Sequence, residues 1–352
     1  MSGRGKRRAT IRDVAELAGV SQTTVSFVLN NVEGVRISEE TRQRVLEAAR
    51  TLNYHPDASA RRLVRGRTRV IAFVEHHSPQ SAQVDAFMAE VLRGIYEVAR
   101  QYDYHVLFEP LLPSEGHFAE RCVQLVRARH ADGIILSGPR SDDEPLLSIR
   151  HEEVPIVLHG RPPTGDWPFI DVDNVRGAWL ATQHLIQLGH QRVGLILHAP
   201  LVYTAAADRK AGYVQALEEA GLTVDERYIQ QANFTPESGK AAMMALLSQS
   251  PRPSAVFVAG DTVALGAIQA AKEAGLRVPE ELAVVGFDDI PLAAYFDPPL
   301  TTVRLPAYGL GWGAGELLIR ILEGDEIASP HILLDTELVV RQSCGAHLSA
   351  AG

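Results

Sequence analysis

The chain has 352 residues, of which 46% are hydrophobic, enough for a small head and a body of one or two core-forming units. Its two cysteines, Cys122 and Cys344, are too few and too far apart for a disulfide framework or a cysteine-rich zinc site. No apolar run reaches the roughly 18–20 residues that span a bilayer, and no apolar signal segment follows the charged N-terminus. We therefore expect a cytoplasmic protein without a membrane partner.

Charge is distributed unevenly along the chain. The net charge of −9, taken alone, argues against a nucleic-acid partner. Residues 1–67, however, hold 13 Lys/Arg against 7 Asp/Glu, a net charge of +6, whereas the remaining residues hold 21 against 36, a net charge of −15. A basic head on an acidic body is typical of a protein whose head meets DNA phosphates and whose body does not.

The head begins with two short helices joined by a tight turn. Thr10 can cap the first helix, with Asp13 completing a capping box, and Ser21 can cap the second after the turn at Gly19 and Val20. On the second helix Val25, Val28 and Leu29 recur at the spacing of a buried stripe. The exposed side chains are then four that can reach base edges in a major groove: Gln22, Thr23, Ser26 and Phe27. This order predicts a helix-turn-helix DNA reader, and the alternative is a small helical module without a DNA role.

A third helix and a basic linker complete the head. Ser38 opens the third helix, which we expect to run to about Leu52 and to close a small core through Val45, Leu46 and Ala49. After Pro56, a helix of about two turns could reach Gly66, but so short a helix is marginal alone and would form on DNA.

Within that linker the residues leave two interpretations open. Leu63, flanked by Arg61, Arg62 and Arg65, has the character of an apolar wedge inserted between base steps, with arginines on the phosphates. A plain basic linker is the other.

The body alternates strand and helix patterns. Short Val/Ile/Leu-rich runs bounded by Gly, Pro or Asp predict buried parallel strands at 70–74, 105–109, 133–137, 156–159, 193–197, 255–259 and 283–287. Helices are predicted at 87–101, 118–129, 174–188, 209–220, 236–247, 262–274 and 308–322, and a last strand at 337–340. The series predicts a doubly wound α/β body of two lobes, with a chain crossing near 161–169 and a ligand cleft at the carboxyl ends of the strands.

The sequence gives little support for an enzyme or a metal site. The chain has no Gly-x-Ser-x-Gly elbow, no phosphate-binding loop ending in Gly-Lys-Ser/Thr and no His-Glu-x-x-His helix. The glycines from Gly309 to Gly313 mimic a dinucleotide fingerprint, but Pro306 stands where the required strand would end, so they are interpreted as the close-packed start of a helix. His184 and His190 do not share a helical face, which argues against a metal site. We therefore expect no catalytic residues, no cofactor and no metal.

Several segments resemble the lactose-repressor/galactose-repressor (LacI/GalR) family of bacterial transcription regulators. They are TIRDVAELAGVSQTTVSFVLN from Thr10, SEETRQRVLEAARTLNYHPDASARRL from Ser38, the stretch between Val172 and His190 with VDN and HLIQLGH, GDTVALGAIQAAKEAG from Gly260, and VPEELAVVGFDDIPLAAYFDPPLTTV from Val278. The resemblance covers nearly the whole chain in order.

For the head, the resemblance implies a homodimer that binds a near-palindromic operator. Gln22, Thr23 and Phe27 match the family's major-groove readers, and Phe27 departs from the more often polar residue at its position, which favours thymine contacts. Asn30 and the region near Arg36 match backbone contacts. Ala60 and Leu63 match the hinge helix, whose leucine opens the central base step.

For the body, the resemblance implies two lobes of periplasmic-binding-protein type with a small-molecule effector between them. Asp288, Arg209 and Phe234 match effector-binding positions, and a carboxylate and a guanidinium beside an aromatic face suit a polyhydroxylated ring. Four residues of the other lobe, near strand ends or a helix start, are further candidates: Phe87, Ser137, His159 and Arg161. Asp288 could instead brace the crossing between lobes, and Asp261 is expected to cap a helix.

The predicted organisation is a helix-turn-helix domain at 1–54, a hinge at 55–67, an effector-binding and dimerisation body at 68–345 and a tail at 346–352. Within the body the N-lobe takes about 68–163 and 298–326, and the C-lobe about 167–295 and 328–345. The tail lacks apolar heptads that would add a coiled coil, so we expect a dimer.

Within that organisation, the predicted function is repression relieved by a sugar. The alternatives are corepression by a purine or sugar phosphate, and a sugar-binding protein without a DNA role.

Overall fold

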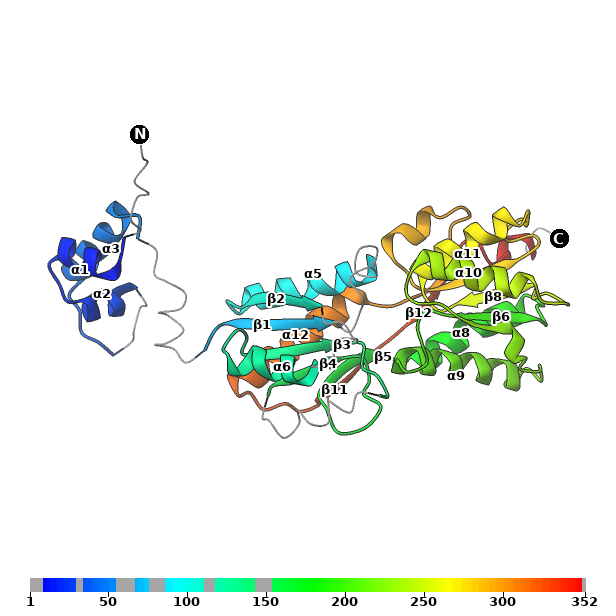
Figure 1. The fold of residues 1–352 in the computed structure, drawn as a ribbon, viewed down its shortest axis with the longest axis horizontal. Helices are drawn as coiled ribbons and strands as arrows, with labels where there is room; N and C mark the ends of the chain where they lie inside the picture. Colours follow the sequence, from blue (N-terminus) through cyan, green and yellow to red (C-terminus); the bar gives the residue numbers. More distant parts are fainter. Residues whose placement is uncertain are drawn as a thin grey trace. The chain divides into compact units, whose positions relative to one another are not determined.

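The computed structural model describes residues 9–29, 34–54, 67–75, 86–110, 118–142 and 154–349. The chain divides into two compact units, Met1–Thr68 and Arg69–Gly352, and each is described by itself (Figure 1). The predicted hinge helix, with Ala60, Arg62 and Leu63, and the predicted backbone contact Asn30 lie outside the described residues.

The first unit contains three short helices around a small apolar core. They are α1 (Ile11–Ala18), α2 (Gln22–Leu29) and α3 (Glu39–Thr51). The capping box forms as predicted, since the Thr10 N–H donates to Asp13 Oδ2 at 2.7 Å and the Asp13 N–H donates back to Thr10 Oγ1 at 3.4 Å. Gly19 ends α1 in the left-handed region with φ 66°, which glycine tolerates best. Val14, Val25 and Val45 are fully buried between the helices.

The second unit has two lobes, each built on one parallel sheet (Figure 1). The N-lobe sheet, in spatial order, contains β11 (His331–Leu334), β5 (Phe169–Val172), β4 (Ile156–His159), β3 (Gly133–Ser137), β1 (Val70–Glu75) and β2 (His105–Pro110). The C-lobe sheet contains β12 (Glu337–Val339), β10 (Thr301–Arg304), β9 (Ala283–Asp288), β8 (Ala255–Val258), β6 (Val193–Leu197) and β7 (Ile229–Gln231). Only the pair of β10 and β12 is antiparallel among these described strands.

Helices cover both faces of each sheet, as expected for doubly wound α/β lobes. The N-lobe helices are α5 (Ala86–Gln101), α6 (Phe118–Arg127) and α12 (Ala307–Glu323). The C-lobe helices are α8 (Asn174–Gln187), α9 (Thr204–Glu219), α10 (Pro236–Leu247) and α11 (Asp261–Glu273), with the 3₁₀ turns η3 (Glu226–Tyr228) and η4 (Pro291–Tyr295) and the terminal α13 (Ala346–Ser349). Strand β1 shows the layering, because Ile71 and Phe73 face α5 and α12 whereas Ala72 and Val74 face α6.

The lobe boundaries differ from the sequence expectation in three places. Strand β5 pairs with β4, so the first crossing follows Val172 and the chain does not cross at 161–169. Strand β10 lies in the C-lobe sheet, although 298–326 was assigned to the N-lobe, and β11 lies in the N-lobe sheet, although 328–345 was assigned to the C-lobe. The three crossings thus fall between β5 and α8, between β10 and α12, and between β11 and β12.

The helices α5 and α12 touch backbone to backbone. A methyl group at Gly94 would stand 2.2 Å from the carbonyl oxygen of Tyr308, and one at Gly311 would stand 1.9 Å from that of Val91. The glycine run is therefore the predicted packing surface of a helix rather than a phosphate-binding loop.

We predict that Gly311→Ala lowers the free energy of unfolding by about 2 kcal/mol, because the added methyl group must push two backbones apart. Gly309→Ala is the matched control on the same helix, since its methyl group would meet the nearest side chain at 3.4 Å and would improve helix propensity. Urea unfolding of the purified protein checks both. Equal stability of the two variants would contradict this account of the α5–α12 contact.

No helix in the described part of the chain is long and apolar enough to cross a membrane.

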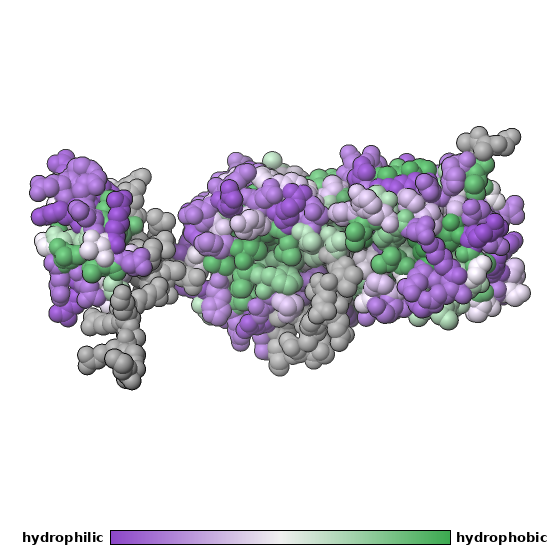
Figure 2. Space-filling model, turned by 90° about the horizontal axis from the view of Figure 1, so that it is seen from above, coloured by the Kyte–Doolittle hydropathy of each residue, from purple (hydrophilic) through white to green (hydrophobic). Residues whose placement is uncertain are grey.

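Seen from above, apolar side chains gather over part of the N-lobe surface among polar ones (Figure 2). Tyr96 on α5 is 57% exposed, and Tyr295 in η4 of the C-lobe is 84% exposed.

Candidate functional site

Helix α2 presents polar side chains on its outer face. Gln22 and Thr23 are exposed, Ser26 and Phe27 are half-buried, and Val25 and Val28 face the core. The helix is capped by Ser21, whose Oγ accepts a hydrogen bond from the Thr24 N–H at 3.1 Å. This geometry leaves the start of α2 open to a DNA groove.

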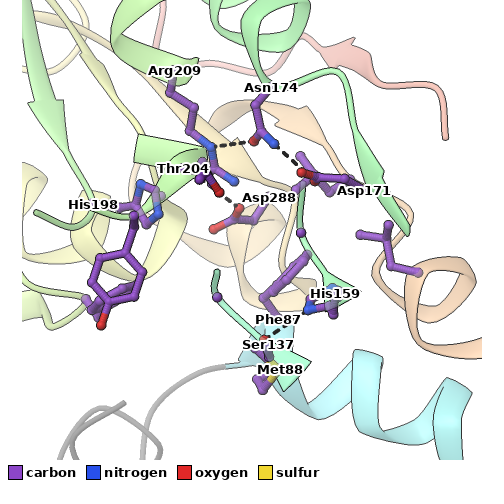
Figure 3. A pocket seen from close by; sticks show the side chains of 18 of the residues that line it. Phe87, Met88, Ser137, His159, Asp171, Asn174, His198, Thr204, Arg209 and Asp288 are labelled. Atoms are coloured by element: carbon purple, nitrogen blue, oxygen red, sulfur yellow. Dashed lines mark hydrogen bonds and ion pairs between the residues drawn. The ribbon is translucent and has the colours of Figure 1, made fainter. Parts of the chain in front are cut away.

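The second candidate site is a cavity between the two lobes of the body (Figure 3). Its walls come from the carboxyl ends of parallel strands: Ser137 ends β3, His159 ends β4 and Asp288 ends β9. Six of the seven predicted effector-binding residues line this one cavity, namely Phe87, Ser137, His159, Arg209, Phe234 and Asp288. Whether they bind an effector stays a prediction, but the structure brings them together.

Arg209 belongs to the C-lobe wall of the cavity, beside Asn174 and Asp288 (Figure 3). It is 6% exposed, and its guanidinium donates from Nε to Asn174 Oδ1 at 2.9 Å and from Nη1 to the carbonyl oxygen of Ala259 at 2.7 Å. The same Nη1 lies 3.6 Å from Asp288 Oδ1, and the group stacks 3.9 Å above the centre of the Phe287 ring. Burial lowers the pKa of Arg209, and the neighbouring carboxylates oppose that shift, so the group stays charged.

Asp288 and its neighbour adopt unusual backbone conformations. Asp288 has φ 122° and Asp289 has φ 54°, and non-glycine residues adopt positive φ only when their surroundings compensate. Asp289 supplies part of that compensation, since its carboxylate accepts hydrogen bonds from Arg304 at 2.6 Å and from Arg341 at 2.7 Å. The chain crossing, which Asp288 could have braced, is therefore braced by Asp289. Asp288 itself lines the cavity.

The prediction that Asp261 caps α11 is wrong. Gly260 holds the cap position, and the helix has no side-chain cap there. The fully buried Asp261 carboxylate instead accepts hydrogen bonds from the Ile290 N–H at 3.0 Å and from Thr302 Oγ1 at 2.7 Å. It is turned into the protein, where burial and the nearby Asp288 raise its pKa well above the ordinary value.

Two further polar residues line the cavity that were not predicted, Asp171 within β5 and Asn174 at the start of α8. Asp171 accepts hydrogen bonds from the Arg161 N–H at 2.7 Å, from the Val172 N–H at 2.7 Å and from Asn174 Nδ2 at 3.1 Å. Burial raises the pKa of Asp171 despite these donors. The VDN segment carried a signal for Asn174, since polar residues directly after a buried strand stand at the ligand edge of a parallel sheet, whereas Asp171 lies inside the strand.

The N-lobe wall contains a buried Ser–His pair. His159 Nδ1 lies 3.0 Å from Ser137 Oγ, and the Phe87 ring stacks on the imidazole with 6.3 Å between centres. Burial lowers the pKa of His159 to about 4, so the imidazole is neutral at pH 7.

Aromatic side chains form the remaining C-lobe wall. The Phe234 ring packs edge-on against His198, with 5.5 Å between centres, and against Tyr203, with 5.2 Å. Phe234 was predicted, whereas His198 and Tyr203 follow β6 in a loop with no periodic pattern. These faces can stack on the C–H face of a sugar or on a planar base.

The lobes also meet at the cavity rim. The Ser141 N–H donates to the carbonyl oxygen of Val202 at 2.7 Å, and the Arg140 guanidinium lies 5.0 Å from the Tyr203 ring centre. Arg161 does not line the cavity, unlike the other six candidates, because its Nη2 crosses to Asp208 Oδ2 of α9 at 2.8 Å. The rim is thus a polar contact between lobes beside the aromatic wall.

The histidines considered for a metal have other partners. His184 Nε2 lies 3.3 Å from Cys344 Sγ, and His190 Nδ1 lies 3.0 Å from Ser254 Oγ. No cluster of three metal-ligating side chains occurs among the residues the structure describes.

Comparison with known proteins matches both units. The family "Bacterial regulatory proteins, lacI family" matches residues 10–57, and "Periplasmic binding protein-like domain" matches residues 182–344. The chain is 36% identical to the HTH-type transcriptional repressor CytR of Escherichia coli (strain K12), over 96% of this chain and 97% of that protein. It is 35% identical to the HTH-type transcriptional regulator CelR of Thermobifida fusca, over 96% and 99%.

Solved structures agree with these sequence relatives. A CelR–cellobiose complex superposes with a TM-score of 0.73 at 34% identity, covering 96% of this chain and all of that one. The lac repressor dimer bound to operator and the anti-inducer ONPF superposes with a TM-score of 0.83 at 29% identity, covering 96% and 99%. Head and body together define a helix-turn-helix transcription regulator with a binding-protein-like body, and not an enzyme. The chain belongs to the lacI family of bacterial regulatory proteins.

We predict that acidification destabilises the body through His159. The unfolded histidine binds a proton near pH 6.5 and the folded one only near pH 4, so the unfolded state gains protons first and stability falls as the pH drops through that window. His159→Gln should remove up to about 3 kcal/mol of this loss. Urea unfolding at pH 7 and at pH 4.5 measures it.

His184 and His190 also have pKa values lowered by burial, so part of the acid destabilisation should remain in the variant. Asp171 and Asp261 act with the opposite sign, because their raised pKa values favour the folded state on acidification. The difference between wild type and variant isolates His159. An unchanged pH dependence in the variant would show that its imidazole is not held neutral.

Proposed function

We propose that this regulator represses transcription from a near-palindromic operator and is released when a sugar binds between the lobes of its body. This proposal rests on one observation: five predicted effector-binding residues from both lobes line the same cavity, namely Arg209, Asp288, Phe234, Ser137 and His159. A ligand that contacts both lobes stabilises one arrangement of the lobes over another, and it shifts operator affinity by its difference in affinity for those arrangements.

The DNA-binding mode follows from the head. Two heads of a homodimer place two α2 helices in successive major grooves, where Gln22, Thr23, Ser26 and Phe27 reach base edges. Ala60, Arg62 and Leu63 act at the centre of the operator, with Leu63 as the wedge and Arg62 on phosphate.

Exposed apolar side chains such as Tyr96 and Tyr295 favour burial against a second copy. Binding to chromosomal DNA places the protein in the cytoplasm.

Two relatives support a sugar ligand and one supports a different class. The CelR complex contains cellobiose, and the lac repressor has also been solved with ONPG. The HTH-type transcriptional repressor PurR of Haemophilus influenzae (strain PittEE) is 35% identical over 95% of this chain. The aromatic wall of Phe234, His198 and Tyr203 can take a planar base as well. Corepression by a purine is therefore the second candidate.

We predict that one sugar raises the thermal stability of the full-length protein and weakens its binding to an operator selected from random DNA. A ligand at 100 times its dissociation constant that binds only the folded state adds about 2.7 kcal/mol. The panel contains cellobiose, glucose, galactose and ribose, with adenine and guanine for the second candidate. A purine that strengthens operator binding would replace induction by corepression, and no response to any of them would contradict both.

We predict that in Asp288→Ala the ligand no longer weakens operator binding, because the carboxylate lines the cavity. Operator binding without ligand should be kept, because the head is unchanged. Asp166→Ala is the matched control, since that carboxylate is 76% exposed and pairs with His331. Fluorescence anisotropy of labelled operator, with and without ligand, reads both variants. A retained response in Asp288→Ala would place the ligand elsewhere.

We predict that Gln22→Ala weakens specific operator binding by about 1–3 kcal/mol, the usual scale for losing a base contact, and leaves nonspecific binding unchanged. Gln43→Ala removes another exposed glutamine, on α3, whose Nε2 donates a hydrogen bond to Glu39, and should change affinity by less than about 0.5 kcal/mol. Titration of selected operator and of random DNA at one salt concentration compares them. Similar losses in both variants would argue against α2 as the reader.

A further inference from the structure

Arg209 is the one Lys or Arg that lines the interlobe cavity among the residues the structure describes. Its charge is already engaged, because Asp288 Oδ1 lies 3.6 Å from Nη1 and two oxygens accept hydrogen bonds from the same guanidinium. An anionic group on a ligand would have to compete with Asp288 for it.

The guanidinium groups beside the cavity are engaged in the same way. Arg140 donates from Nε and Nη2 to the two carboxylate oxygens of Asp142, both at 2.7 Å. Arg161 pairs with Asp208 at 2.8 Å. Such bidentate and close pairs hold an arginine in place, so neither is ready to receive a phosphate without first losing its carboxylate.

Carboxylates outnumber cations along the cavity walls. Asp171 and Asp288 both line it, against the single guanidinium of Arg209. His159 adds no positive charge at pH 7, because burial lowers its pKa to about 4. A phosphate dianion placed here would face the Asp288 carboxylate beside the one guanidinium that this carboxylate already pairs with, and like charges at such separations repel strongly in a partly desolvated site.

The same walls suit an uncharged ligand with several hydroxyl groups. The carboxylate of Asp288 and the polar pair of Ser137 and His159 stand on opposite lobes (Figure 3). The ring of Phe234, packed against His198 and Tyr203, adds an apolar face to the lining. We propose that the cavity binds an uncharged, multiply hydroxylated ligand, a free sugar or nucleoside, and rejects its phosphate ester. This proposal rests on the proposed function and adds that the ligand of the cavity is uncharged.

The selection places the regulator before a phosphorylation step. A kinase that transfers the terminal phosphoryl group of a nucleoside triphosphate to a ligand hydroxyl releases the nucleoside diphosphate and a proton, and forms the ester that the cavity rejects. Such a kinase consumes the effector and ends the signal. The regulator therefore reports the free ligand and not its phosphorylated product.

The test uses the full-length protein and two kinds of probe. The first is inorganic phosphate, compared with chloride at equal ionic strength in thermal unfolding at pH 7. Wild type should show no phosphate-specific stabilisation, whereas Asp288→Asn should gain one, because Arg209 then lacks its carboxylate partner. Asp166→Asn, the exposed control, should gain none. Phosphate stabilisation of wild type, or none in Asp288→Asn, would overturn the proposal.

The second kind of probe is matched pairs, measured by calorimetry: ribose with ribose 5-phosphate, glucose with glucose 6-phosphate, and adenosine with adenosine 5′-monophosphate. In any pair whose neutral member binds, the ester should bind at least about 100-fold more weakly. An ester that binds as tightly would overturn the proposal. If no neutral member binds, the sugar effector fails on that panel, and the phosphate comparison still decides the charge selection.

Discussion

The body is organised around one buried guanidinium. Arg209 joins the start of α8 through Asn174, the end of β8 through Ala259 and the end of β9 through Asp288. A buried charge that loses one such partner is strongly destabilised, so these three segments cannot separate independently. Because β5 crosses into α8 directly before Asn174, the guanidinium also fixes the C-lobe side of an interlobe crossing. The C-lobe wall of the cavity is therefore held in one arrangement before any ligand arrives.

Backbone strain collects at the same place. Phe234, Asp288 and Asp289 all have positive φ values, and two of them line the cavity. Strain of this kind costs about 1–3 kcal/mol for each residue and persists only where surrounding bonds hold it. At Asp289, ion pairs with Arg304 and Arg341 hold the backbone, and Arg304 ends the strand that crosses to the N-lobe. Ligand-facing geometry and the crossing between lobes are thereby linked through adjacent residues.

The sequence predicted what periodicity and chemistry can show. Strands 133–137, 156–159 and 193–197 and helix 236–247 have the predicted bounds, because long apolar runs and clear caps define them. The short strands β5, β7, β10 and β11 were missed. The omission of β5, β10 and β11 misplaced the lobe boundaries, because pairing with strands distant in the sequence decides which sheet each of them joins. Asp261 was misjudged because a carboxylate at a helix start usually caps it, and Arg161 because only the fold reveals Asp208 as its partner. Tyr203 carries no local signal, whereas His198 directly follows the predicted strand 193–197 and stands at the ligand edge of the sheet for that reason.

The proposed function requires that the ligand site between the lobes and the DNA-binding site in the head be energetically coupled. Coupling of this kind is reciprocal, so operator DNA must change ligand affinity by the same factor by which ligand changes operator affinity. The direct measurement is calorimetric titration of the identified ligand into the free protein and into the protein saturated with operator. We expect the ligand to have different dissociation constants for the free and the operator-bound protein. Their ratio should equal the ratio of the operator dissociation constants measured with and without ligand. Equal ligand affinities in the two states would contradict the coupling.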